Sequence, residues 1–212
     1  IAWRKEEDKK IAPVLRDLGV QLLEIAPTRK WEDPTTADIQ EIMKYVSFWK
    51  SYGIKVIAFQ SMLFNRPDLK IFESKANLEQ TKKYLTDFIK VAGSLDVGIM
   101  VFGSPKNRQR GIVEIGKADT IARDFFYSLG GIAEKAGVIF CIEPNATEYA
   151  CDYITNAQEG ARIVKEVDSR GFGLHLDLAC MTLAGDDIRQ SIVDAKGILR
   201  HFHISEPMLG DV

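Results

Sequence analysis

The stretch Val138-Ile-Phe-Cys-Ile-Glu143-Pro-Asn145 is an apolar, strand-like run that ends in a carboxylate and passes into loop-type residues. The same pattern returns in Phe172-Gly-Leu-His-Leu-Asp177 and again in Ile198-Leu-Arg-His-Phe-His203. Each run therefore places a carboxylate or an imidazole at the C-terminal end of a predicted strand. In a parallel barrel these strand ends converge on one face, where enzymes of that fold carry their active sites.

Strand-like and helix-like segments alternate along the whole chain. The helices are indicated by apolar residues at helical spacing, as at residues 39, 42, 43, 46 and 49. Repeated strand–helix units predict parallel strands joined by right-handed crossovers. The predicted strands are residues 20–26, 54–59, 97–102, 138–143, 172–177 and 198–204, and the predicted helices are residues 5–18, 37–52, 77–92 (with Ser74 or Asn77 as the cap), 118–136, 156–167 and 186–195.

The number of strands decides between two fold classes. Ile1-Ala2-Trp3 resembles the tail of a strand, which makes seven strands in a chain of 212 residues, whereas a (βα)8 barrel typically takes about 250. We therefore predict an α/β fold in which residues 1–212 form a single TIM-barrel domain, with its first strand clipped and its eighth βα unit absent. The polypeptide is expected to begin before Ile1 and to continue past Val212. The alternative, a doubly wound open sheet, usually carries a G-x-G-x-x-G turn, which is missing here.

The composition is that of an ordinary soluble globular protein, with 46% hydrophobic and 27% charged residues. A formal net charge of −2 argues against a general nucleic-acid-binding surface, which is usually basic. No apolar run approaches the length of about 18 residues that predicts a membrane span. The three cysteines are an odd number without framework spacing, which favours a reduced, cytoplasmic protein.

The three strand ends suggest a metal site. Glu143, Asp177 and His203 offer carboxylate and imidazole ligands, a combination that suits a divalent ion. Because side chains alternate along a strand, His175 shares a face with Asp177, and His201 shares one with His203. The alternative is that Glu143, Asp177 and the histidines form a hydrogen-bonded cluster that closes the barrel mouth. His201, one layer deeper, is expected to be structural, and His175 could be structural or functional.

Two further regions are candidates for substrate contacts. Glu24 ends the second strand and is expected to face the pocket, or else to pair with Arg29 or Lys30. The loop after the fourth strand, Gly103-Ser-Pro-Lys106-Asn-Arg108, could hold an anion through Lys106 and Arg108. A solvated basic loop is the alternative interpretation, because exposed Lys and Arg need no explanation.

Four segments carry a resemblance to a known family: Val101-Phe-Gly-Ser-Pro-Lys-Asn-Arg108, Ile142-Glu-Pro-Asn145, Leu176-Asp177 and His201-Phe-His203-Ile-Ser-Glu206. The chain resembles the xylose isomerase-like barrels, in the branch of sugar and sugar-phosphate isomerases and epimerases. The resemblance implies a divalent ion, most often Mn²⁺ with Mg²⁺, Co²⁺ or Zn²⁺ possible, held by Glu143, Asp177, His203 and a second Glu that would lie beyond Val212. It also implies that the two glutamates exchange the substrate proton.

Three positions depart from the pattern of the ketose epimerases in this family. Cys180 stands where they carry a substrate-binding His, Leu209 where they carry an Arg, and Tyr149 where they carry a Glu. The residues expected to bind the metal therefore match the family pattern more closely than the residues expected to bind the sugar. The DNA-repair endonucleases of the same superfamily use many more histidines than the three in this chain.

The sequence thus predicts a metal-dependent isomerase or epimerase of a sugar or sugar phosphate, acting through a metal-stabilised enediolate with Glu143 as a catalytic group. A dehydratase of the sugar-acid or inosose type on the same scaffold, or a non-catalytic sugar-binding barrel, is the alternative. No nucleic-acid or membrane partner is expected, and a homo-oligomer is possible. The predicted substrate-binding residues are Glu24, Lys106, Arg108, His175 and Glu206.

Overall fold

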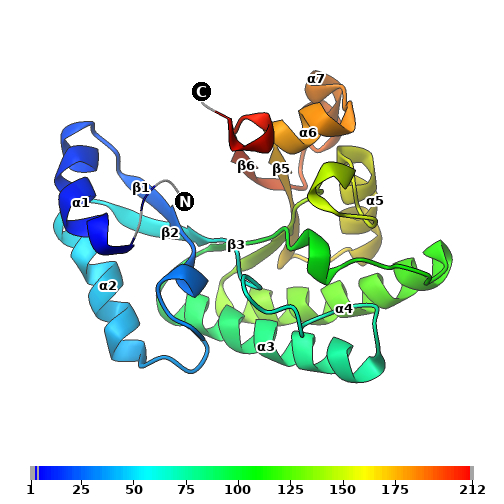
Figure 1. Cartoon of the computed structure of the whole chain (residues 1–212), viewed down its shortest axis with the longest axis horizontal. Coiled ribbons are helices and arrows are strands. Elements are labelled where there is room, and N and C mark those ends of the chain that lie inside the picture. The colour runs from blue at the N-terminus through cyan, green and yellow to red at the C-terminus, as the bar shows by residue number, and fades with distance from the viewer. Residues whose placement is uncertain (1–2, 4, 211–212) are drawn as a thin grey trace.

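The computed structural model describes residue 3 and residues 5–210 of the chain. Six parallel strands form one curved sheet and are hydrogen-bonded to one another in chain order (Figure 1). This order is that of a barrel wall, because a doubly wound sheet reverses its strand order part-way. The predicted α/β, barrel-type fold is confirmed; the predicted strand tail at residues 1–2 lies outside the described residues. The strands are β1 (Leu22–Ile25), β2 (Lys55–Phe59), β3 (Ile99–Phe102), β4 (Ile139–Ile142), β5 (Phe172–Asp177) and β6 (Leu199–His203).

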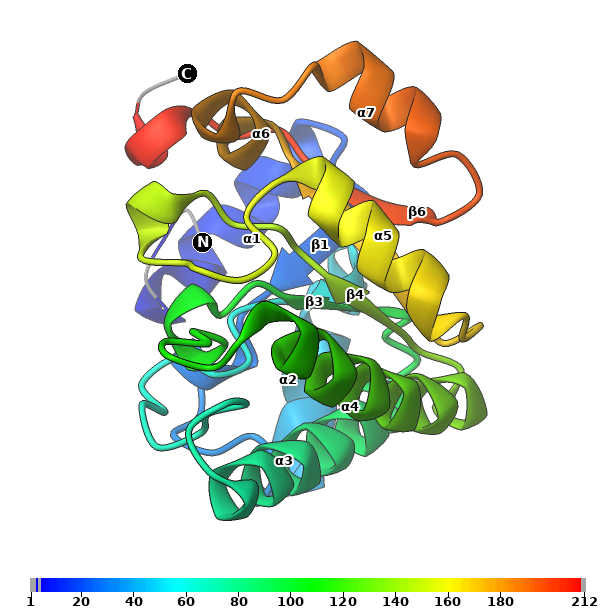
Figure 2. The same ribbon diagram turned by 90° about the vertical axis from the view of Figure 1, so that its right-hand side faces the viewer.

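The long helices lie on the outer, convex face of the sheet, with α3 and α4 packed side by side, while the short helix α6 lies at the end of β5 and lines the pocket (Figures 1 and 2). They are α1 (Asp8–Asp17), α2 (Ile39–Ser51), α3 (Lys75–Ser94), α4 (Ile115–Ala136), α5 (Ala157–Val167), α6 (Leu178–Ala184) and α7 (Ile188–Asp194). Short 3₁₀ turns span Lys5–Glu7, Pro27–Arg29, Pro105–Asn107, Thr147–Tyr149 and Pro207–Leu209.

Local signals set the helix ends. Ser74, not Asn77, is the cap of α3, because its side chain accepts a hydrogen bond from the Asn77 amide. The left-handed Gly137, with φ of 71°, ends α4 at Ala136, where the predicted helix 118–136 also ends. Helix α6 was not predicted from the sequence. It begins because the Asp177 side chain accepts a hydrogen bond from the Cys180 amide, at 2.9 Å.

Aromatic side chains fill the layer between the sheet and the helices. Phe126 of α4 stacks on Phe172 of β5 with ring centroids 4.8 Å apart, and Phe102 and Phe140 extend the same cluster. All four rings are buried. Burying one such side chain contributes about 1.5–3 kcal/mol to stability, so this layer fixes the strand ends that carry the polar residues described below.

Strands β1 and β6 are the two edges of the sheet, and no backbone pairing joins them within residues 5–210. Side chains connect these edges instead. Glu24 of β1 accepts hydrogen bonds from His201 and His203 of β6, across the inside of the half-barrel. Among the described residues, no helix combines the length and apolar character that a membrane crossing requires.

Candidate metal and active site

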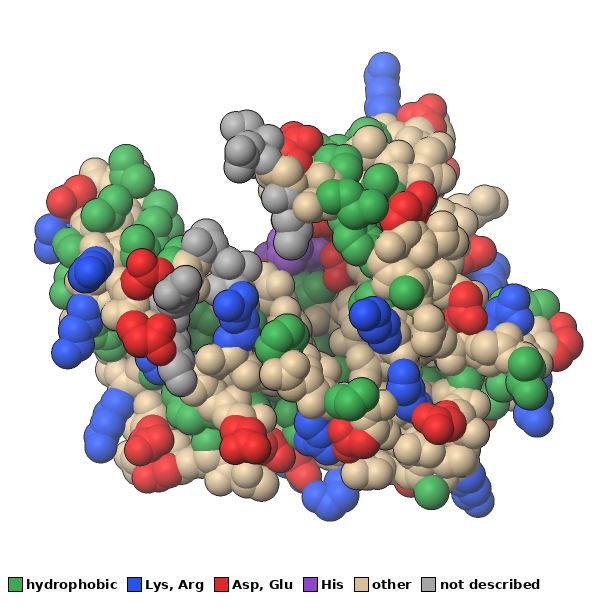
Figure 3. Space-filling model, viewed as in Figure 1, with side chains coloured by type: hydrophobic (Ala, Val, Ile, Leu, Met, Phe, Trp, Pro, Cys, Tyr) green, Lys and Arg blue, Asp and Glu red, His purple; other side chains and the backbone are tan. Residues whose placement is uncertain are grey.

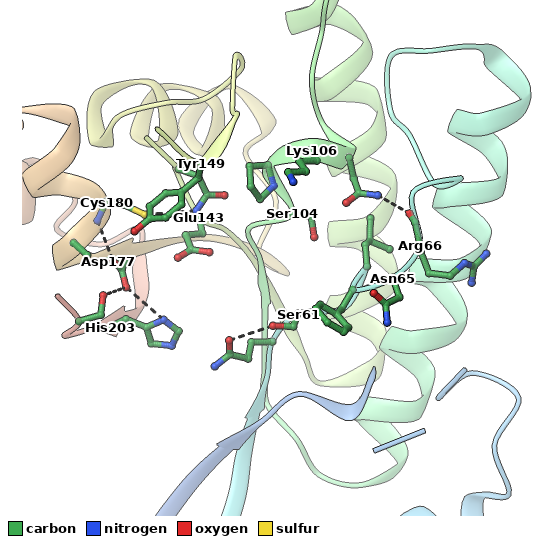
Figure 4. Close-up of a pocket in the computed structure, with 18 of the residues that line it drawn as sticks. Ser61, Asn65, Arg66, Ser104, Lys106, Glu143, Tyr149, Asp177, Cys180 and His203 are labelled. Atoms are coloured by element: carbon green, nitrogen blue, oxygen red, sulfur yellow. Dashed lines mark hydrogen bonds and ion pairs between the residues drawn. The ribbon is translucent and has the colours of Figure 1, made fainter. Parts of the chain in front are cut away.

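A pocket of about 1020 Å³ opens where the C-terminal ends of the strands meet. Histidine side chains, purple in Figure 3, lie inside the hollow on this face. The pocket is lined on one side by the ends of β4, β5 and β6, and on the other by the loops that follow β2 and β3 (Figure 4). The active-site face of a parallel barrel is therefore the face that is hollowed here.

The structure brings Glu143, Asp177 and His203 together with His175. Each of the four offers one ligand atom, and these atoms all lie within 4.8 Å of one another. Glu143 follows β4, Asp177 ends β5 and His203 ends β6, so the alternation of side chains along each strand aims them at one point (Figure 4). The described residues contain a second such group, formed by the three histidines.

Asp177 has two tasks in this arrangement. One carboxylate oxygen accepts from the Cys180 amide at 2.9 Å and so begins α6. The other oxygen accepts from the Ser205 hydroxyl at 2.7 Å and lies 3.8 Å from Nδ1 of His203. These contacts fix the carboxylate and hold one oxygen toward the cluster.

Glu143 lies in a nearly dry part of the pocket floor, with 16% of its side chain exposed. The pKa of Glu143 is raised to about 7, mainly because the carboxyl group is buried. The charge of His203 opposes this rise, and the charge of Asp177 adds to it. A carboxyl group whose pKa is close to neutral can both accept and return a proton, which is what general acid–base catalysis requires.

Glycine at position 103 makes room for this carboxylate. A Cβ atom at Gly103 would overlap Oε2 of Glu143 and would lie 3.2 Å from the Asn145 side-chain oxygen. The carboxylate therefore rests directly on the backbone of the loop after β3.

Substituting Gly103 by Ala should displace Glu143 and leave the fold intact. A displacement on the order of 1 Å at a reacting group costs about 100-fold in rate, so we expect kcat/KM to fall by about that factor with little change in the unfolding temperature. Gly98→Ala is the matched control, because a Cβ atom at Gly98 meets no atom within 4 Å. Equal rate losses in both variants would contradict this role for Gly103.

Glu24 supports the cluster from behind. Its Oε2 atom accepts from Nε2 of His201 at 2.5 Å and from Nε2 of His203 at 3.1 Å, and its Oε1 atom lies 2.9 Å from Nε2 of His203. Burial raises the pKa of Glu24, but the hydrogen bonds from the two histidines outweigh it and lower the pKa to about 2. The alternative pairing with Lys30 is not formed, because Lys30 pairs with Asp8. Glu24 is not among the residues that line the pocket, and its predicted substrate contact stays a prediction.

The same contacts decide which nitrogen of His203 is available. Burial lowers the pKa of His203, but the hydrogen bond and charge of Glu24 outweigh it and raise the pKa. Because Nε2 donates to Glu24, Nδ1 is the nitrogen that faces Asp177. An arrangement of carboxylate, histidine and metal of this kind fixes the ligand nitrogen and the orientation of the ring.

Replacing Glu24 by Gln removes the charge that orients His203. Loss of such a supporting group typically costs about 10–100-fold in metal affinity, and we expect a loss in that range, measured by competition with a chelator. Glu148→Gln, an exposed change near the pocket, should leave the affinity unaltered. An unaltered affinity in Glu24→Gln would show that the Glu24–His203 pair has no part in metal binding.

Arg108 does not lie where the sequence led us to expect. Its side chain is fully buried beneath the loop and donates to the backbone oxygens of Gly103, Glu143 and Ile154 and to the Asn145 side chain. The guanidinium therefore holds the ends of β3 and β4 together. In this placement Arg108 makes its hydrogen bonds within the protein, and its predicted contact with an anionic substrate stays a prediction.

The other predicted substrate-binding residues differ in whether they line the pocket. Lys106 is exposed and lines the pocket, and its backbone oxygen accepts from Lys70 at 2.6 Å. Glu206 is exposed and is not a lining residue. Tyr149 and Cys180 both line the pocket.

Sequence reasoning missed several side chains of the pocket wall. Ser61 and Asn65, on the loop after β2, line the pocket and have left-handed backbones with φ of 55° and 59°. The only sequence signal was the loop-type composition between β2 and α3, which indicates a turn and not a particular side-chain direction.

The donor set fits a divalent ion. Two carboxylates and two imidazoles converge, and both ring nitrogens of the buried His175 have no hydrogen-bond partner among the described residues. Oxygen and imidazole ligands together suit Mn²⁺, Fe²⁺, Co²⁺ or Zn²⁺.

The model of the xylose isomerase-like TIM barrel family matches residues 13–210. The chain belongs to this family. Among curated members, this xylose isomerase-like barrel is similar to D-psicose 3-epimerase of Ruminiclostridium cellulolyticum, with 26% identity over 210 residues, which cover 96% of this chain and 68% of that protein.

Solved structures share the fold of this xylose isomerase-like barrel. D-psicose 3-epimerase from Clostridium cellulolyticum H10, solved with D-tagatose, superposes with a TM-score of 0.78 and 21% identity over 96% of this chain and 69% of that one. The IolI protein, solved with a bound zinc atom, superposes with a TM-score of 0.73 and 16% identity over 99% of this chain and 72% of that one.

Proposed function

We propose that the protein is a divalent-metal-dependent isomerase or epimerase that acts on a sugar or sugar derivative by moving a proton next to a carbonyl group. The observation that carries this proposal is Glu143, a buried carboxyl group with a pKa of about 7 at the floor of a large pocket, beside converging metal-type ligands. The similarity to D-psicose 3-epimerase supports the same reaction class.

Glu143, Asp177 and His203 would hold the ion, which when bound polarises neighbouring carbonyl and hydroxyl oxygens and stabilises the negative charge that develops on them. Asp177 is fixed for this task by Ser205 and the start of α6. His203 is fixed by Glu24, which leaves Nδ1 directed into the cluster. Mn²⁺ is the ion we would supply first.

The proton transfer falls to Glu143. In its ionised form the carboxylate would accept a proton from the substrate carbon next to the carbonyl. In an isomerisation its protonated form would return that proton to the neighbouring carbon, whereas in an epimerisation a second acid on the opposite face of the substrate would supply the proton. Burial disfavours the charged form and so raises the pKa of Glu143 to about 7. Both the ionised and the protonated forms are therefore populated near neutral pH. Arg108 holds the backbone oxygen of Glu143 at 2.8 Å and so keeps the strand end in place.

The opposite wall would hold the rest of the substrate. Ser61, Asn65 and Lys106 offer a hydroxyl, an amide and an ammonium group across the pocket from Glu143 (Figure 4). Such groups suit the hydroxyls of a sugar, and Lys106 would also accept a phosphate or another anionic end.

The proposal is tested by stripping the protein of metal, reconstituting it with Mn²⁺, and assaying it against a panel of ketoses and ketose phosphates. We expect epimerised or isomerised product from at least one member, and none from the stripped protein. Product that has lost water would favour the dehydratase alternative instead. Tight binding of a sugar without turnover would favour the non-catalytic barrel.

A further inference from the structure

His175 is the side chain of this site that the proposed chemistry does not use. It lies on β5, two residues before Asp177, and none of its surface is exposed. Neither ring nitrogen has a hydrogen-bond partner within the part of the chain that the structure describes. A buried imidazole without partners is costly, because each polar nitrogen has given up its hydrogen bonds to water.

None of the neighbouring carboxylates satisfies His175. Glu24 takes hydrogen bonds from both other histidines through Oε2, and neither of its oxygens lies within 4.0 Å of a ring nitrogen of His175. Asp177 accepts from the Cys180 amide and from the Ser205 hydroxyl. The closest acidic atom is Oε1 of Glu143, which lies 3.7 Å from Nε2 of His175 and is too far for a hydrogen bond.

Contacts also distinguish His175 from the other two histidines. His201 and His203 both donate to Glu24, whereas no described side chain or backbone group contacts a ring nitrogen of His175 at hydrogen-bond distance. An imidazole binds a metal ion through the lone pair of such a free ring nitrogen. The ring of His175 faces two carboxylates that no Lys or Arg side chain pairs with in the described residues.

The spacing suits a shared ion. Donor atoms on opposite sides of one ion are separated by about 4 Å, twice the usual ligand distance of about 2.0–2.2 Å. The four donor atoms of Glu143, His175, Asp177 and His203 all lie within 4.8 Å of one another. A small inward movement of the side chains therefore brings all four to one ion.

We propose that His175 is itself a metal ligand, so that the ion is held from below by a buried imidazole in addition to Glu143, Asp177 and His203. This inference rests on the proposed function, since it concerns the same ion. It assigns to His175 a ligand role in place of the substrate contact predicted from the sequence. His201, bound to Glu24, stays outside the ligand set.

The chain has three histidines, which makes the test direct. Protein labelled with ¹³C and ¹⁵N at histidine is stripped of metal and titrated with Zn²⁺, and the ring resonances are followed by NMR. We expect the signals of His175 and His203 to move to ligated positions at one equivalent of Zn²⁺, while those of His201 remain close to their metal-free positions.

Substitution gives an independent measurement. His175→Phe keeps a ring of similar size but has no donor, and we expect it to fold and to bind Zn²⁺ at least about tenfold more weakly. Cys141→Ala is the matched control, a buried change on the neighbouring strand β4 at a residue outside the donor group; it should bind as the unaltered protein does.

The outcomes separate this inference from the proposed function. Unaltered affinity in His175→Phe, together with His175 resonances that do not move, would overturn the inference and leave the metal-dependent function standing; a bridging water would then account for the ring. A protein that takes up no divalent ion at all would overturn both. Moved resonances and weaker binding support both.

Discussion

Replacing Glu143 by Gln is expected to lower kcat by about two to four orders of magnitude, the usual contribution of a general acid or base. Gln has the same shape as Glu but cannot accept and return a proton. Its amide is also a poorer metal ligand than a carboxylate, so the rate should be measured at saturating metal. Far-ultraviolet circular dichroism and the unfolding temperature should stay close to those of the unaltered protein.

Glu148→Gln provides the control for this experiment, because Glu148 is an exposed acidic residue on the loop that follows the same strand. Its kcat should be unchanged. A Glu143→Gln protein with unaltered kcat at saturating metal would contradict the role of Glu143 as the proton-transferring group, although it could still be a ligand.

Replacing Arg108 by Ala is expected to destabilise the protein by at least about 3 kcal/mol, because hydrogen bonds made by charged groups contribute about 1.5–3 kcal/mol each. The substitution removes one donor from each of three backbone oxygens and from the Asn145 side-chain oxygen, and it opens a cavity beneath the loop. Urea unfolding measures the change.

Lys106→Ala is the matched control on the same loop, and a surface change of this kind stays within about 0.5 kcal/mol. The two variants should also differ in kinetics. Lys106→Ala should raise KM for an anionic sugar, whereas Arg108→Ala acts through stability and through the position of Glu143. An Arg108→Ala protein that is fully stable and has only a raised KM would restore the substrate role predicted from the sequence.

Much of the fold follows from the sequence because hydrophobic runs of strand length are short and sharply bounded in this chain. The strand predicted at 172–177 and the observed strand β5 have the same limits. Helix α6 was missed because Asp177 serves both as a ligand-type residue and as a helix cap, and the sequence shows only one acidic residue at the end of a strand. Helix α6 spans Leu178–Ala184 and begins directly after Asp177.

Some residues of the candidate site could likewise be placed from the sequence, and others could not. Glu143, Asp177 and His203 could be predicted to meet, because strand ends and the alternation of side chains dictate where they lie. The direction of Arg108 could not, because it depends on how the loop leaves β3. Ser104 adopts a left-handed backbone with φ of 45° and turns the chain into the 3₁₀ turn Pro105–Asn107, which directs Arg108 inward.

The contact of Glu24 with His201 and His203 was equally hidden from the sequence. It joins residues that are 177 and 179 positions apart, on the two edges of the sheet. Only the curvature of the half-barrel brings these edges within reach of each other. The two histidines lie on one face of β6 by alternation, but the sequence carried no signal for their common partner.

The central claim, that Glu143 moves a proton next to a carbonyl with the help of a divalent ion, is tested most directly by hydrogen exchange. Protein reconstituted with Mn²⁺ is incubated in D₂O with the ketoses and ketose phosphates of the panel, and each recovered sugar is examined by NMR and mass spectrometry. We predict deuterium at one carbon adjacent to the carbonyl of a single preferred sugar, with loss of the exchange in the metal-stripped protein and in Glu143→Gln. Absence of deuterium from every sugar that a fully metal-loaded protein binds would contradict the account.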